Sequence, residues 1–121
     1  MNKYRNTLQD IHLRIYKFIV SCFNNIVKKI PKSIENNPII SQISSSLTSM
    51  GANDQEADAT TSKKDFIAKY SIVRKETKET KYWLSFIKDS LLVNKTIIEP
   101  YIVECQEILM IISKIIANTR N

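Results

Sequence analysis

The chain has 121 residues, with 18 Lys and Arg against 12 Asp and Glu, which gives a formal net charge of +6. This length suits a single domain. Its one Gly cannot supply a phosphate-binding loop, a dinucleotide-binding turn or the many tight turns of a β-sandwich. The two cysteines, Cys22 and Cys105, lie far apart in the sequence, so neither a zinc motif nor a disulfide framework is indicated.

No stretch of the sequence has enough uncharged apolar residues to form a transmembrane helix. Residues 1–14 carry several charges and no apolar core, and the apolar stretch that follows contains Lys17 and no cleavage site of small residues. The sequence therefore predicts no secretory signal. We expect a cytoplasmic protein with reduced thiols and no membrane partner.

The first predicted helix covers residues 8–30. Its apolar residues recur every three or four positions, which is typical of one face of an amphipathic helix, and Pro31 is expected to end it. The apolar stripe consists of Leu8, Ile11, Ile15, Phe18, Ile19, Cys22, Ile26 and Ile30. A short polar connector follows, in which we expect Ile34 to be the one anchor to the core.

The second predicted helix covers residues 38–59. It starts at Pro38, which is favourable in the first turn of a helix that follows an Asn N-cap. Ile43, Leu47 and Met50 have helical spacing, whereas the opposite side of the helix is rich in serine. Serine is a poor helix former, but its small side chain lets another element come close. This side is therefore a candidate for close packing rather than for solvation.

The third predicted helix, residues 63–91, has the most regular apolar stripe in the chain. Ser62 and Asp65 resemble a shortened capping box at its start. The stripe consists of Phe66, Tyr70, Val73, Thr77, Thr80, Leu84, Ile87 and Leu91.

The fourth predicted helix covers residues 97–118. Thr96 and Glu99 form a capping box at its start, and Pro100 is tolerated in the first turn. The connection from the third helix is so short that we expect these two helices to be antiparallel neighbours. The chain is therefore predicted to be an all-α, up-down antiparallel four-helix bundle that forms a single domain over residues 1–121.

Four segments of the sequence carry a family resemblance. They are IPKSIEN at residues 30–36, SMGANDQEA at 49–57, SKKDFI at 62–67 and KETKETKYWL at 75–84. In order and spacing they are similar to the bacterial four-helix-bundle proteins named for the intervening sequences of 23S ribosomal RNA genes, the S23-type family. The match spans about residues 8–118. The chain departs from the family at Asp54, where relatives usually have an aromatic residue.

The resemblance implies a homopentameric ring of four-helix bundles. One branch of the family, the accessory proteins of diversity-generating retroelements, works with a reverse transcriptase and binds nucleic acid. For most members, including the ordinary branch that this chain is more similar to, no activity is established. The resemblance therefore implies an oligomer and leaves its partner open.

No set of residues in the sequence predicts catalysis or metal binding. His12 is the only histidine, and no second His or Cys lies at ligand spacing. Asp54, Glu56 and Asp58 lack the Gly and the distal Glu of a calcium loop, and we interpret them as solvated charges at a helix end. No nucleophile–base pair or pair of catalytic carboxylates can be assembled. We therefore expect no enzymatic activity, no cofactor and no metal site.

A polar set at the junction of the second and third predicted helices matches the family. It consists of Asn53, Glu56, Ser62 and Asp65. One interpretation is a binding site at this junction. The other, which we favour, is that these side chains satisfy free backbone N–H and C=O groups at two adjoining helix ends.

Tyr82, Trp83 and Phe86 cluster near the end of the third predicted helix, among lysines. Aromatic residues among cations are typical of a stacking platform for single-stranded nucleic acid. Beside an apolar stripe, however, burial in the core or at a subunit interface is commoner. We therefore favour burial for this aromatic cluster.

The third predicted helix carries eight of the 18 cations and four of the 12 anions. A helical projection places these charges on two flanks and an outward face. One flank carries Lys63, Arg74, Lys81 and Lys88, the other carries Asp65, Glu76 and Glu79, and the outward face carries Lys64, Lys75 and Lys78. Flanks of opposite charge suit head-to-tail packing around a closed ring.

These observations predict a non-enzymatic oligomeric scaffold, a homopentamer by the resemblance, with two alternatives for its partner. In the first, it binds RNA or DNA electrostatically and without sequence preference through the basic face of the third helix. In the second, it is a structural protein that docks a polypeptide and binds no nucleic acid. The candidate nucleic-acid-binding residues are Lys63, Lys64, Arg74, Lys75, Lys78 and Lys81.

Overall fold

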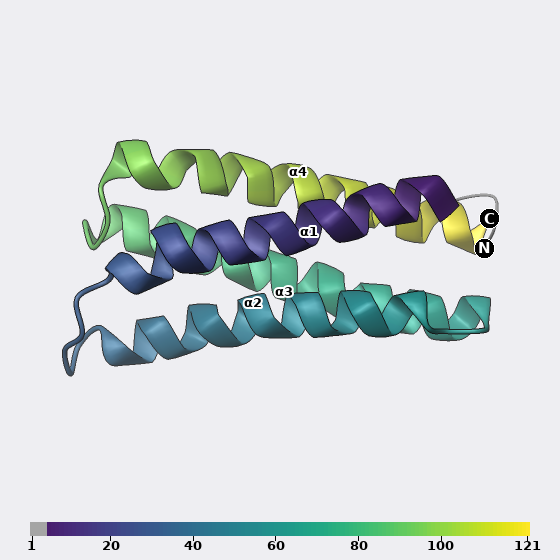
Figure 1. Ribbon diagram of the computed structural model, residues 1–121, viewed down its shortest axis with the longest axis horizontal. Coiled ribbons are helices and arrows are strands. Elements are labelled where there is room, and N and C mark those ends of the chain that lie inside the picture. The colour runs from purple at the N-terminus through teal and green to yellow at the C-terminus, as the bar shows by residue number, and fades with distance from the viewer. Residues whose placement is uncertain (1–4) are drawn as a thin grey trace.

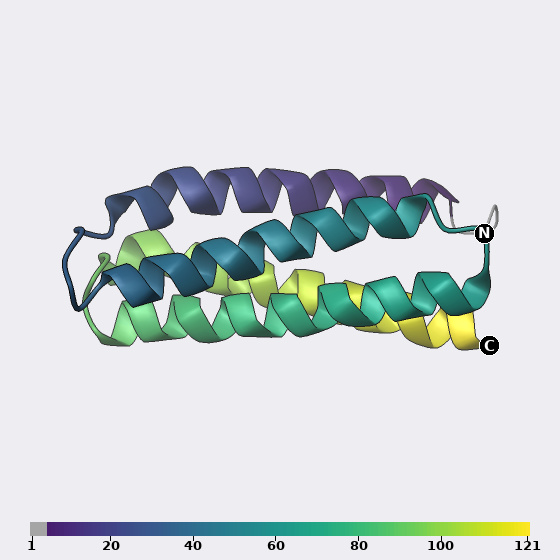
Figure 2. The same ribbon diagram turned by 90° about the horizontal axis from the view of Figure 1, so that it is seen from below.

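The computed structural model describes the backbone of residues 5–121 and the side chains of residues 11–121. Within this part, four α-helices run alternately up and down along one long axis (Figure 1 and Figure 2). They are α1 (Arg5–Asn25), α2 (Asn37–Asp58), α3 (Lys63–Asp89) and α4 (Lys95–Arg120), and a short 3-10 helix, η2 (Val27–Lys29), follows α1. The predicted all-α four-helix bundle is confirmed.

The helices form a closed square in which α1 and α3 lie on opposite corners. α1 contacts α2 and α4, and α3 packs against the same two helices more extensively. The start of α1, the connection from α2 to α3 and the end of α4 all lie at one end of the bundle (Figure 2). Within residues 5–121, no helix combines the length and the apolar character needed to span a bilayer.

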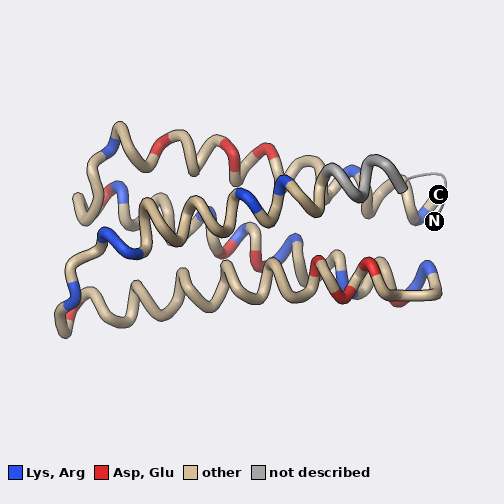
Figure 3. Tube along the Cα trace, in the orientation of Figure 1, with Lys and Arg blue, Asp and Glu red and all other residues tan. Residues whose placement is uncertain are grey.

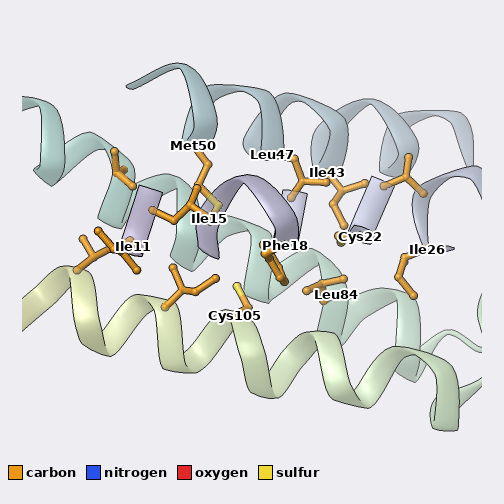
Figure 4. Close-up of a cluster of buried hydrophobic side chains, with 14 of the residues drawn as sticks. Ile11, Ile15, Phe18, Cys22, Ile26, Ile43, Leu47, Met50, Leu84 and Cys105 are labelled. Carbon is orange, nitrogen blue, oxygen red and sulfur yellow. The ribbon is translucent and has the colours of Figure 1, made fainter. Parts of the chain in front are cut away.

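One face of each helix enters a shared apolar core (Figure 4). The stripe predicted for α3 is buried from Phe66 to Ile87. In the first predicted stripe, Leu8 lies outside the described side chains, Ile19 is partly buried, and the others are buried. α4 buries apolar residues from Ile98 to Ile116. Fully burying an Ile or Leu side chain contributes roughly 1.5–3 kcal/mol, so these stripes largely determine the fold. Both cysteines lie in the core as free thiols, and burial raises the pKa of each to about 12, which makes them poor nucleophiles.

The serine-rich side of α2 is packed in part, as its composition indicated. Ser46 is buried against α3, where its Oγ lies 2.8 Å from Thr80 Oγ1, and it donates to the carbonyl of Ile43. Gly51 faces α1, and a Cβ atom at this position would lie 3.0 Å from Ile19 Cδ1. Small residues therefore let α2 approach both of its neighbours.

The α-helical part of the first helix ends earlier than predicted. α1 stops at Asn25, η2 follows, and Ile30 is extended. Ile26, Val27 and Ile30 are nevertheless buried, because the 3-10 turn keeps apolar side chains on the core side after the α-helix has ended. Apolar spacing could not distinguish these two conformations. Ile34, predicted to anchor the connector, is exposed.

The connection from α3 to α4 also differs from the prediction. α3 ends at Asp89, and Leu91 is exposed with φ of 62°, a left-handed conformation that usually falls to Gly at a helix end. The predicted capping box at the start of α4 is wrong. Asn94 is the N-cap, because its Oδ1 accepts a hydrogen bond of 2.8 Å from the N–H of Thr96.

Candidate nucleic-acid interface

The outward face of α3 contains a hollow lined by cations. The hollow is open, has a volume of about 350 Å³ and is lined by Ser71, Arg74, Lys75 and Lys78; we call it the cationic hollow. Residues at these spacings lie on one side of a helix over two turns. The stripe of core residues fixes the rotation of α3, and that rotation places these four side chains away from the core.

The cations of the hollow have little internal charge compensation. Arg74 and Lys78 form no ion pair within 4 Å with the side chains of residues 11–121, and the ammonium group of Lys75 lies 4.0 Å from a carboxylate oxygen of Glu76. A pair at this distance that involves an exposed lysine contributes little. Burial raises the pKa of Glu76, and the neighbouring charge of Glu79 adds to this. The hollow therefore has positive charge available for an anion.

The other predicted nucleic-acid-binding residues lie outside the hollow. Lys64 is exposed on the same face nearer the start of α3, and Lys63 is exposed beside it. Lys81 donates a hydrogen bond of 2.6 Å to Oε1 of Gln106 in α4. The structure therefore brings three of the six predicted residues together, places Lys64 in line with them, and holds Lys81 against the bundle.

One residue from each charged flank of α3 is held inside the chain. Lys81 faces α4, whereas Glu76 is buried in the bundle. Other members of the flanks, among them Lys63 and Asp65, are exposed, and head-to-tail packing through the flanks stays a prediction.

The aromatic cluster is not in the core as a whole. The exposed fractions of Tyr82 and Phe86 are 59% and 39%, whereas Trp83 is partly buried against the core. Trp83 packs edge-on against both rings, with centroid distances of 4.9 Å to Tyr82 and 5.8 Å to Phe86. Burial in the core is therefore wrong for Tyr82 and Phe86, which continue the outward face of α3 beyond the cationic hollow.

The polar set at the junction of α2 and α3 makes local contacts. Asn53 donates to the carbonyl of Ser49, Glu56 pairs with Lys69 at 3.3 Å, and the Ser62 hydroxyl caps α3 by accepting from the N–H of Asp65. The Ser62 contact is a helix cap, the Glu56 contact joins α2 to α3, and the Asn53 contact lies within α2. They account for Asn53, Glu56 and Ser62 without a ligand.

A buried polar network that sequence reasoning missed joins α1, α2 and α3. Asp54 is 1% exposed, and its Oδ1 lies 2.7 Å from His12 Nδ1 and accepts a 2.8 Å hydrogen bond from the Tyr70 hydroxyl. His12 Nε2 lies 3.4 Å from a carboxylate oxygen of Asp58, which is exposed. We call these four residues the His12 network. The interpretation of the acidic residues as solvated is wrong for Asp54.

The electrostatics of the His12 network favour a charged imidazole. Burial alone would lower the pKa of His12, but the hydrogen bond and charge of Asp54, together with Asp58, raise it above its ordinary value. Burial, with the charge of Asp54, raises the pKa of Tyr70, so its hydroxyl remains a donor. Among the described residues, no three His, Cys, Asp or Glu side chains come close enough to hold a metal ion. The contacts of Asp54 with His12 and Tyr70 instead join α1, α2 and α3 to one another.

A sequence signal for the network did exist. Asp54 lies four residues after Met50, so it continues the buried stripe of α2. A carboxylate on the core side of a helix needs a partner, and His12 lies next to the buried Ile11 on α1. Extending the stripe by one turn would have placed Asp54 inside.

α1 has a second apolar stripe that faces outward. It consists of Leu13, Tyr16, Val20 and Phe23, all exposed, at helical spacing. Residues 37–53 of the neighbouring α2 contain no charged residue, which Figure 3 shows as a long uncharged segment of the trace. This surface of α1 and α2 therefore differs from the charged remainder of the bundle.

A further open hollow of about 570 Å³ lies where the end of α1 meets the start of α4. Its lining combines polar and apolar side chains and includes Asn25, Lys29, Leu92, Ile97 and Tyr101. Asn25 and Tyr101 already bond to each other. Lys29 is the one charged residue in this lining. The lining therefore offers no cluster of charged groups that would hold a ligand.

Comparisons with known proteins agree with this fold. Residues 9–114 match the family model described as 23S rRNA-intervening sequence protein. A matching crystal structure is that of a protein with unknown function from the S23 ribosomal protein family of Bacteroides thetaiotaomicron VPI-5482, with 30% identity, coverage of 90% of this chain and 97% of that chain, and a TM-score of 0.73. A comparison with curated proteins finds no match.

Proposed function

The chain belongs to the 23S rRNA-intervening sequence protein family, and we propose that it is the subunit of a non-enzymatic oligomeric scaffold that binds nucleic acid through the outward face of α3. The cationic hollow is the observation that carries this proposal. Arg74, Lys75 and Lys78 line it together with Ser71, and Arg, Lys and Ser side chains bind phosphate oxygens in proteins.

Binding in this hollow is electrostatic. Phosphates that enter it replace condensed counterions of the nucleic acid, and the release of those ions drives association. The lining offers long flexible cations and one hydroxyl, whereas sequence reading needs side chains placed against base edges. The proposed binding therefore discriminates little between sequences.

The outward stripe of α1 supports the oligomeric half of the proposal. Interfaces between subunits are enriched in aromatic residues and depleted of charge at their centres, and the α1 stripe beside the uncharged surface of α2 has this composition. We propose a cyclic homopentamer with this surface at the subunit contact. Light scattering gives the mass directly, and a monomer at micromolar concentration would contradict the oligomer.

The same stripe supports a second candidate function, the docking of another polypeptide without nucleic acid. Val20→Glu distinguishes the two roles of the stripe, because a charge inside a subunit contact lowers the oligomeric mass. An oligomer whose mass is unchanged by Val20→Glu leaves this surface free for a different protein.

A salt titration tests the nucleic-acid half. Fluorescence anisotropy of a labelled oligonucleotide is measured between about 50 and 200 mM salt, and each phosphate contact contributes a slope of about −0.7 to −0.9 in log affinity against log salt. Three cations in the hollow predict a slope of about −2 to −3. Absence of binding at about 50 mM salt would remove nucleic acid from the proposal.

A further inference from the structure

We propose that the nucleic acid held by this face is single-stranded and that one of its bases stacks on Tyr82. This inference rests on the proposed function and adds the class of ligand. It comes from the exposed aromatic cluster, which electrostatic binding alone does not use.

The aromatic cluster lies in register with the cationic hollow. Lys75, Lys78, Tyr82 and Phe86 follow one another at spacings of three or four residues along the outward face of α3, so their side chains share one side of the helix. Tyr82 lies roughly 6 Å along the axis beyond Lys78. A strand whose phosphate occupies the hollow therefore has an adjacent base at the ring of Tyr82.

The ring of Tyr82 is exposed and also supported. More than half of the residue is accessible, and the ring packs against Trp83 at 80° and 4.9 Å between centroids. Trp83 in turn lies against the core and against Phe86. A ring that is already positioned loses little conformational entropy when a base stacks on it.

The combination of charge and rings decides between the occupants of this face. A ligand that complements both must carry phosphates and open aromatic faces, and a single strand carries both. A duplex presents phosphates, but its bases are stacked on each other. A second copy of this chain would bring the same cations to the contact, and like charges repel. Asp89 is exposed beyond Phe86, and its negative charge would repel phosphates that extend past the aromatic cluster.

The test compares an oligothymidylate of about 20 nucleotides with a duplex of about 20 base pairs, by anisotropy at about 50 mM salt. Tyr82→Leu removes the ring, and Tyr82→Phe is the matched control that keeps the ring at the same exposed position. We expect Tyr82→Leu to weaken binding of the single strand by about tenfold and to leave duplex binding unchanged. Tyr82→Phe should bind as the parent chain does.

Trp83, the one tryptophan of the chain, provides a second readout because it touches Tyr82. Its fluorescence should change when the oligothymidylate binds, and the change should be absent with the duplex. Circular dichroism melting and light scattering of Tyr82→Leu accompany these measurements. Both should match the parent chain, because the Tyr82 ring contributes to neither the core nor a subunit contact.

The outcomes separate the two proposals. Equal binding of single strand and duplex with no effect of Tyr82→Leu would overturn the stacking and leave the electrostatic function standing. No binding of either probe would overturn the proposed function and this inference with it. A lower oligomeric mass for Tyr82→Leu would assign the aromatic cluster to a subunit contact and also overturn the inference.

Discussion

The His12 network and the cationic hollow are both clusters of ionisable residues, but they differ in charge balance. In the network, the His12 imidazole lies between the carboxylates of Asp54 and Asp58, and Asp54 also accepts a bond from Tyr70. In the hollow, Arg74, Lys75 and Lys78 lie together on the surface, and within the described chain their one carboxylate partner is Glu76, at 4.0 Å from Lys75.

This difference separates two roles for charge in one bundle. A buried charge must be compensated within the chain, since desolvation would otherwise destabilise the fold. A surface charge is solvated and can remain uncompensated until a partner supplies the opposite charge. The comparison therefore assigns the network to stability and the hollow to binding, and changes in either cluster should leave the other property unaffected.

The largest effect is expected from Asp54→Ala. This change leaves His12 and the buried Tyr70 hydroxyl without their common partner, and removing one member of a buried charged pair costs about 3 kcal/mol of unfolding free energy. Urea unfolding measures this. Asp58→Ala is the matched control, because Asp58 is exposed and its loss should cost less than about 1 kcal/mol. Equal losses for the two variants would contradict the assignment of the network.

Lys78→Glu tests the opposite cluster. A carboxylate in the cationic hollow repels phosphate, so nucleic-acid affinity at about 50 mM salt should fall by at least about tenfold and the salt slope should become shallower by about 1 or more. The unfolding free energy should change by less than about 0.5 kcal/mol, because Lys78 is exposed and has no packing role. A large loss of stability would show that the hollow has a structural role.

Leu91→Gly should raise the stability of the bundle, whereas Asp54→Ala should lower it, and neither change touches the cationic hollow. Leu91 has a positive φ and an exposed side chain, so Gly removes the steric cost of the left-handed conformation and forfeits little packing. We expect the unfolding free energy to rise by about 1 kcal/mol and nucleic-acid affinity to stay constant. A destabilised variant would mean that Leu91 makes contacts which its exposure does not indicate.

The smallest effect is the pH dependence of the His12 network. The pKa of His12 is raised in the folded chain, so its contribution to stability is complete below the unfolded pKa of about 6.5 and is lost as the pH rises through the folded value. The melting temperature of the parent chain should therefore fall above about pH 6.5 relative to that of His12→Gln. If the melting temperatures of the two chains change in parallel with pH, a charged His12 imidazole does not contribute to stability.

Much of the fold could be predicted because it depends on apolar periodicity. The four helices and the family were predicted correctly, and the buried stripe of α3 was correct from Phe66 to Ile87. The errors lie where the backbone leaves the α-helix without a Gly to mark the change. At Val27 a 3-10 turn keeps the same side inward, and at Leu91 a bulky residue takes the left-handed position.

The site was harder to predict, because helical geometry gives the direction of a side chain but not its partner on another helix. The outward direction of Lys75 and Lys78 follows from helical geometry, so it could be predicted. The burial of Asp54 follows from the stripe of α2, but its partner His12 lies 42 positions away, and no local pattern contains such a pair.

The salt dependence of oligonucleotide affinity, measured for two triple variants of equal net charge, decides whether α3 carries a nucleic-acid-binding site. Arg74→Gln/Lys75→Gln/Lys78→Gln empties the cationic hollow of charge, and Lys28→Gln/Lys29→Gln/Lys32→Gln removes the same three charges near the end of α1, where all three lysines are exposed. We predict that the first variant loses most of the salt slope and of the affinity, whereas the second retains the slope of the parent chain to within about 1. Equal losses in both variants would show that net charge alone attracts the nucleic acid, and would contradict a binding site on α3.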